Sequence, residues 1–248
     1  MAAQSPHDQR ELLRTRQRSV RLALNTYHSL STEWKDKSAE GRQAAGAAAD
    51  SLLQLRCDAA CRSLLVAGVS VDPDRYLPHR PLGALEPIDG LQVTAATKLR
   101  CQLWDSVRQT VAISKDLLDT AQRVRQVINI YFDSSEESST QAVALPERPV
   151  FATIPWSRIA QWMHDLAESY GKEARAKKAI AEALTQMAGQ YCPILLSAAH
   201  EPDPLKDTDD EVRTRLEIYL TSWSLESDLD EPTICSHISD ITEDMRTF

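Results

Sequence analysis

The positions of its prolines constrain the fold of this chain more than any other feature of the sequence. The 12 prolines leave three long intervals free of proline, at 7–72, 88–145 and 156–192. Because a proline inside a helix costs about 3 kcal/mol, such intervals permit long helices. Glycine is also scarce, with 7 residues where average usage would give roughly 17. The chain is therefore predicted to be all-α.

Each interval carries apolar or small residues at heptad spacing, the pattern of a coiled-coil seam. In the first interval the seam comprises Val20, Leu24, Tyr27, Ser31, Trp34, Ser38, Gly41, Ala45, Ala48, Leu52, Leu55 and Ala59. In the second it comprises Val93, Ala96, Leu103, Val107, Thr110, Ser114, Leu117, Ala121, Val124, Ile128 and Tyr131. In the third it comprises Ile159, Met163, Leu166, Tyr170, Lys177, Ile180, Leu184 and Met187. These seams predict long antiparallel helices that form an elongated coiled-coil-like bundle.

The middle of the first seam, from Ser38 to Ala48, consists of small residues. Small side chains let a neighbouring helix approach closely, but they also weaken an isolated helix because less surface is buried. Gly41 and Gly46 each cost roughly 1 kcal/mol relative to alanine. The sequence therefore predicts either close packing or a kink near 38–46.

Start and stop signals define the predicted elements. The helices are expected at about 8–68, 91–132, 156–191 and 209–223, as one elongated bundle spanning 8–223. A capping box, Thr208 with Glu211, opens the last of them. Its inward residues are predicted to be Val212, Leu216, Tyr219, Leu220 and Trp223.

The remaining segments lack periodicity. Residues 69–90 are rich in proline and 133–150 are acidic and rich in serine, so both are predicted to be flexible linkers. Residues 1–7 are expected to be disordered. After Trp223 the chain carries seven acidic residues against one arginine, which predicts a disordered acidic tail over 224–248.

Charge and motif content exclude several classes of function. The net charge is −8, so the overall field does not attract nucleic acid, and any nucleic-acid contact is expected to be indirect. No apolar run approaches the length of a membrane span, so no membrane association is expected. Phosphate-binding loops, nucleophile elbows and zinc-protease motifs are absent from the sequence. We therefore expect neither an enzyme nor a bound cofactor or metal.

The strongest candidate for a metal site is a pair of cysteines. Cys57 and Cys61 are four residues apart, so they share a helix face, but no further cysteine or histidine lies nearby to complete a site. Both thiols are expected to be reduced structural residues.

Two sets of basic residues have two possible roles. Each is either a solvated helix face or a contact stripe for an acidic partner or nucleic acid. The first is Lys172, Arg175, Lys177 and Lys178, and the second is Arg14, Arg16, Arg18 and Arg21. Two tryptophans that open the third helix, Trp156 and Trp162, leave a similar choice between core packing and an interface anchor.

Residues Phe151–Leu184 resemble the C-terminal helix of the family of cyclin-dependent-kinase-interacting proteins, CINP. The resemblance is carried by Phe151, Thr153, Pro155, Leu166, Glu168, Tyr170, Lys172, Glu173, Lys177, Lys178, Ile180, Ala181 and Leu184. This chain departs from the pattern at Ile154, where the family has tryptophan, and at Ala174–Ala176, where it has an apolar triplet. Beyond Leu184 the match continues more loosely to Leu216.

The resemblance implies a non-enzymatic adaptor. Such a protein pairs with a related helical protein, AIRIM, and joins an AAA+ ATPase assembly in ribosome large-subunit maturation and DNA replication. It also implies links to a cyclin-dependent kinase, to a replication-initiation kinase and to the ATR-interacting subunit of the DNA damage checkpoint. The expected location is the nucleus, with a cytoplasmic pool. The candidate partner-binding residues are Phe151, Pro155, Trp156, Trp162, Tyr170, Lys172, Lys177 and Lys178.

Two other functions stay open from the residues. The heptad seams alone also fit a structural coiled-coil subunit of a kinetochore or tethering complex. A small helical hydrolase or metal enzyme is a third possibility, but no motif in the sequence supports it.

Overall fold

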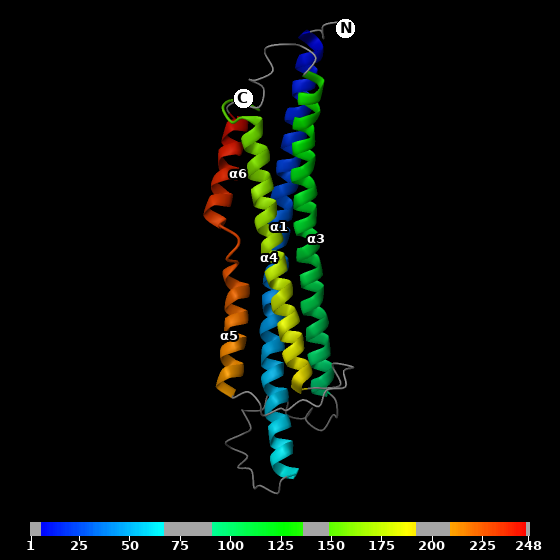
Figure 1. The fold of residues 1–248 in the computed structure, drawn as a ribbon, viewed down its shortest axis with the longest axis vertical. Coiled ribbons are helices and arrows are strands. Elements are labelled where there is room, and N and C mark those ends of the chain that lie inside the picture. The colour runs from blue at the N-terminus through cyan, green and yellow to red at the C-terminus, as the bar shows by residue number, and fades with distance from the viewer. Residues whose placement is uncertain (1–5, 67–90, 136–148, 192–208, 247–248) are drawn as a thin grey trace. The chain divides into compact units, whose positions relative to one another are not determined.

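The computed structural model describes residues 6–66, 91–135, 149–191 and 209–246, and within these ranges the protein is all-helical. The helices are α1 Pro6–Val66, α3 Leu91–Ser135, α4 Trp156–Tyr191, α5 Asp209–Leu225 and α6 Glu231–Arg246 (Figure 1). The one β-type contact in the described ranges is an isolated bridge between Pro149 and Pro155. The all-α prediction is therefore confirmed.

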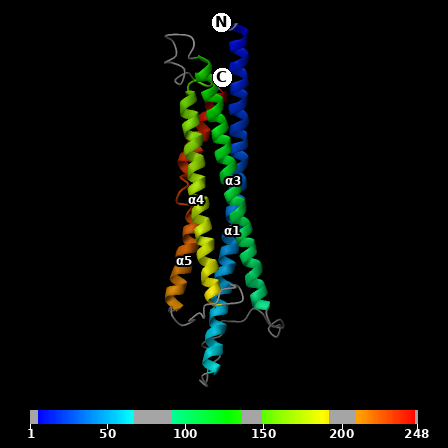
Figure 2. The ribbon, with the colours of Figure 1, turned by 45° about the vertical axis from the view of Figure 1, so that its right-hand side comes forward.

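The first four helices lie where the proline-free intervals and the capping box place them. Helix α1 runs through residues 38–46 without a break. The chain direction of α3 is opposite to that of α1 and α4 (Figure 2). Residues 1–5, 69–90 and 136–148 of the segments predicted to lack structure fall outside the described residues. Residues 6–7 and 133–135, predicted to be disordered or linker, are instead helical and belong to α1 and α3.

The predicted disordered tail over 224–248 is wrong for residues 231–246, which form α6. Helix α6 begins at an Asp230 cap, whose carboxylate accepts hydrogen bonds from the Thr233 backbone N–H at 3.4 Å and from its hydroxyl at 2.6 Å. Ile234, Ile241 and Asp244 are buried on one side of the helix. Capping and an apolar face thus outweigh the repulsion among the acidic residues.

The chain folds as two compact units, whereas the sequence predicted a single bundle over 8–223. Unit 1 comprises 1–36, 110–174 and 227–248, and unit 2 comprises 37–109 and 175–226. The boundaries fall inside α1, α3 and α4, so one part of each of these helices belongs to unit 1 and the other part to unit 2.

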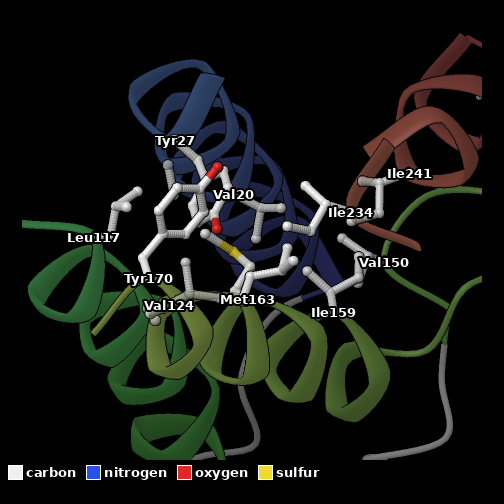
Figure 3. Close-up of a cluster of buried hydrophobic side chains, with 14 of the residues drawn as sticks. Val20, Tyr27, Leu117, Val124, Val150, Ile159, Met163, Tyr170, Ile234 and Ile241 are labelled. Atoms are coloured by element: carbon white, nitrogen blue, oxygen red, sulfur yellow. The ribbon is translucent and has the colours of Figure 1, made fainter. Parts of the chain in front are cut away.

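Unit 1 has a core rich in large side chains. Figure 3 shows Tyr27 and Val20 from α1 beside Leu117 and Val124 from α3, with Met163 and other α4 residues beneath them. Helix α6 adds Ile234 and Ile241 to the same cluster. All of the labelled side chains are buried.

Unit 2 has a core built around small residues of α1. Ala44, Ala45 and Ala49 pack in one cluster with apolar residues of the other helices. These partners are Leu103, Val107, Ile180, Ala181, Leu184, Met187, Val212, Leu216 and Trp223. The small-residue part of the first seam therefore permits close helix packing, as its composition predicts.

Glycine substitutions test this close packing. A Cβ atom at Gly41 would clash with the Ser106 side chain and would lie 2.5 Å from a ring carbon of the buried Trp223. We expect Gly41→Ala to destabilise the protein by about 1–2 kcal/mol, because overpacking outweighs the gain in helix propensity. A Cβ at Gly46 meets nothing within 4 Å, so Gly46→Ala should stabilise it by up to about 1 kcal/mol. Urea unfolding of both variants measures the difference, and equal shifts would contradict close packing at Gly41.

Candidate functional site

Four of the eight candidate partner-binding residues lie in the chain's own core. Phe151, Trp156 and Tyr170 are buried in the cluster of unit 1, and Lys177 is fully buried in unit 2. Of the two alternatives left open for the aromatic residues, the structure of the single chain places Trp156 and Tyr170 in its own core. Pro155 and Trp162 are half-buried, and Lys172 and Lys178 are exposed.

The two exposed lysines, Lys172 and Lys178, form ordinary surface ion pairs within α4. Lys172 pairs with Glu168 at 3.2 Å and Lys178 with Glu182 at 3.8 Å, both at i,i+4 spacing along α4. Such exposed pairs contribute little to stability and are a common feature of solvated helix faces.

Three aromatic residues meet in the core of unit 1. The Tyr170 ring packs edge-on against Tyr27 and Trp34, with centroid distances of 6.2 and 5.1 Å. The Tyr170 hydroxyl forms a 2.8 Å hydrogen bond with Ser31. Burial, together with the nearby Tyr170, raises the pKa of Tyr27 far above its ordinary value. This cluster is a packed core and not an acid–base site.

The Tyr27 hydroxyl has no hydrogen-bond partner among the described residues. A buried unsatisfied hydroxyl costs about 1–3 kcal/mol, so its removal relieves that cost. We expect Tyr27→Phe to leave the free energy of unfolding unchanged or to raise it. Thermal unfolding is the measurement, with Tyr170→Phe as the control, because that variant breaks the Ser31 hydrogen bond and should destabilise. A destabilisation in Tyr27→Phe as large as in Tyr170→Phe would show that the Tyr27 hydroxyl has a partner.

Trp162 holds α6 against α4. Its indole ring stacks on His237 of α6, with centroids 4.2 Å apart and planes inclined by 11°. The Arg158 guanidinium lies 4.9 Å from the same ring. Lys35 of α1 forms an ion pair with Glu231 at the beginning of α6. Of the two alternatives left open for Trp162, the contacts within this chain are those of a residue that packs two of its own helices together.

Asp244 fastens the other end of α6 to the turn before α4. Its carboxylate accepts hydrogen bonds from the backbone N–H groups of Ala152, Thr153 and Ile154 at 3.3, 2.7 and 3.3 Å. The Thr153 hydroxyl donates a fourth at 2.6 Å. Burial raises the pKa of Asp244, but these four hydrogen bonds outweigh it and hold the pKa below its usual value.

The depressed pKa of Asp244 predicts acid release of α6. A carboxylate whose pKa is lower in the folded state adds stability above its unfolded pKa of about 3.9, and that stability is lost as the pH falls through the folded value. Hydrogen exchange of α6 should therefore accelerate at about pH 3 relative to pH 7, after correction for intrinsic rates. In Asp244→Asn this pH dependence should shrink, and an unchanged dependence would contradict the assignment.

A buried lysine closes the end of α5 in unit 2. The Lys177 ammonium donates to the Trp223 backbone carbonyl at 3.1 Å, lies 5.0 Å from the Trp223 ring centre and pairs with Glu226 at 3.0 Å. Ser38 of α1 donates a hydrogen bond to the same Glu226 carboxylate, and the Trp223 indole donates to the Ser38 carbonyl at 3.1 Å. A cation at the carboxyl end of a helix also offsets the helix dipole. We conclude that Lys177 is structural.

Helix α5 keeps a second apolar face turned away from the core of unit 2. Its inner face buries Val212, Leu216 and Trp223, as predicted. The opposite face carries Ile218 and Leu225, whose exposed fractions are 56% and 69%. Because these two residues are seven positions apart, they project from the same side of the helix.

Two threonines complete this outer stripe. Thr214 and Thr221 are exposed and, with Ile218 and Leu225, give a spacing of four, three and four residues. That is the spacing of one side of a coiled-coil seam. This stripe was not predicted from the sequence, although its signal there is the pair of apolar residues, Ile218 and Leu225, that remain once the inner face of α5 is assigned. We name residues 214, 218, 221 and 225 the outer stripe of α5.

The described residues offer no metal site and no membrane-spanning helix. No group of three or more His, Cys, Asp or Glu in the described ranges could hold a metal ion. Cys57 and Cys61 lie in α1, where their side chains are outside the described part. None of the described helices is long and apolar enough to cross a membrane.

Comparison of the chain with protein-family models, with curated proteins and with solved structures found no match.

Proposed function

We propose that this protein is a non-enzymatic interaction subunit that binds a helix of a partner protein along the outer stripe of α5. The observation that carries the proposal is the exposure of Ile218 and Leu225 at heptad spacing on a helix whose other face is already buried. Burying apolar surface contributes about 25 cal/mol per Å², so two large aliphatic residues on one stripe favour association.

The residues beside the stripe define the chemistry of the partner. On one flank of the outer stripe α5 exposes Asp210 and Glu217, again seven positions apart. In coiled coils such flanking positions pair with opposite charges on the facing helix. The partner helix is therefore expected to offer aliphatic residues at heptad spacing with Lys or Arg beside them.

The resemblance of Phe151–Leu184 to the CINP family supports the identity of this partner. We propose a related AIRIM-like helical protein as the direct partner, and an AAA+ ATPase assembly as the machine that the pair joins. The proposed processes are ribosome large-subunit maturation and DNA replication with its checkpoint. Contacts with a cyclin-dependent kinase, a replication-initiation kinase and the ATR-interacting subunit belong to the same proposal, as does a nuclear location with a cytoplasmic pool.

Affinity purification of the full chain from cells tests this function. We expect the chain to recover a second small helical protein and an AAA+ ATPase, both identified by mass spectrometry. The variant Ile218→Asp/Leu225→Asp should lose both by at least tenfold, because each charge would have to be buried at the seam.

The matched control is Ser222→Asp/Ser224→Asp, which adds the same charge to exposed positions of α5 outside the outer stripe. It should retain both partners, and circular dichroism should show equal helicity in all three proteins. A monomer that recovers neither partner would overturn the proposal. Recovery of a rod-like coiled-coil protein alone would favour the structural subunit of another complex.

A further inference from the structure

We propose that α1 binds the phosphate backbone of a nucleic acid duplex through a row of four arginines, Arg10, Arg14, Arg18 and Arg21. This surface lies in unit 1 and does not involve α5. It also differs from the expectation that nucleic acid is contacted only indirectly.

The four arginines share one face of α1. Their spacing of four, four and three residues matches the helical repeat, so the row extends over about 16 Å of helix. All four are exposed. Arg16, which the sequence analysis grouped with this set, is half-buried and belongs to another face. Val20, which belongs to the core, projects from a different side of α1 than the row.

The row is a concentrated positive charge on an acidic protein. Within residues 10–22 the only acidic residue is Glu11, and there is no lysine. Among the described residues, Arg10, Arg14 and Arg18 have no ion-pair partner. Arg21 lies 5.3 Å from the Phe151 ring, a contact that orients one end of the row. Guanidinium groups bind phosphate oxygens in a bidentate manner and are weakly hydrated, so arginine suits this ligand better than lysine.

The surroundings of the row favour nucleic acid over an acidic protein. A protein interface has an apolar centre, but the arginine row has none. The exposed Leu13 and Leu22 are nine positions apart and therefore project on opposite sides of α1. Interfaces with nucleic acid are more polar and far more positively charged, as this one is.

The row fits a duplex contacted through its phosphates. Residues 10–26 contain no aromatic side chain on which an unpaired base could stack. With a net charge of −8 on the whole chain, we expect weak binding that depends strongly on salt.

Fluorescence anisotropy with a labelled DNA duplex of about 20 base pairs tests the proposal over a range of salt concentrations. Four phosphate contacts predict a slope of log affinity against log salt of about −3.6 for the full chain. In Arg14→Gln/Arg18→Gln two phosphate contacts remain, so the slope should be about half as steep, at about −1.8. Both residues are exposed, so the melting temperature should not change.

The matched control is Lys172→Gln/Lys178→Gln, which removes two exposed positive charges from α4 and so changes the net charge equally. It should keep the slope of the unaltered protein. An equal loss of duplex affinity and an equal change of the salt slope in the two double variants would overturn the proposal, because net charge alone would then explain the binding. Displacement of the duplex by polyglutamate at the same charge concentration would also overturn it, in favour of an acidic protein. Affinity for the duplex should be unaffected by Ile218→Asp/Leu225→Asp, which separates this surface from the outer stripe of α5.

Discussion

Replacement of Lys177 by methionine is expected to destabilise the protein by about 3 kcal/mol, the cost of removing one partner from a buried ion pair. Methionine fills much the same volume, so the loss comes from the interactions of the ammonium group. Without it, the Trp223 carbonyl loses its donor from α4 and the partly buried Glu226 carboxylate loses its counter-charge. Urea unfolding followed by circular dichroism measures the change.

Two further variants make this result specific. Lys178→Met alters the next residue, which is exposed, and should change the free energy of unfolding by less than about 0.5 kcal/mol. Adding Glu226→Gln to Lys177→Met removes the uncompensated charge and should recover part of the loss. If the two methionine variants were equally stable, the contacts of Lys177 with Trp223 and Glu226 would not stabilise the end of α5.

Replacement of Asp244 by alanine is expected to release α6 from unit 1 at a cost of about 2–4 kcal/mol. Three backbone N–H groups and one hydroxyl lose a buried, charged acceptor at once, and hydrogen bonds to charged groups contribute more to stability than neutral ones. The effect should be local, because Ile234 and Ile241 supply the remaining deeply buried contacts of this short helix. Hydrogen exchange should therefore accelerate over 231–246 and in the turn at 152–154, with little change in α5.

Asp240→Ala provides the control for this variant, since Asp240 is an exposed acid on the same helix. It should leave the exchange of α6 unchanged. Slow exchange of α6 in Asp244→Ala would mean that the apolar contacts alone hold the helix.

The sequence predicted the helices because their determinants are local. Long intervals without proline, heptad seams and the capping box at Thr208 all act within one segment of chain. Helix α6 was missed because the count of acidic residues hid two local signals. These signals are the Asp230 cap and the apolar residues Ile234, Ile238, Ile241 and Met245, which follow one another at steps of four, three and four.

The candidate site was predicted less well because burial depends on partners distant in sequence. Lys177 occupies a seam position of α4, and the seam did place it inward. Nothing near it in the sequence shows that its counter-charge is Glu226, at the end of another helix. In the same way, Ile218 and Leu225 become a candidate surface only once α5 has buried its opposite face.

Hydrogen exchange of α5 in the recovered complex tests the central claim, which is that the outer stripe of α5 binds a partner helix. The protein alone should be compared with the protein bound to its small helical partner. The proposal predicts slower exchange across 214–225 in the complex, and no such protection in Ile218→Asp/Leu225→Asp under the same conditions. Unchanged exchange over 214–225, with protection confined to other helices, would contradict it.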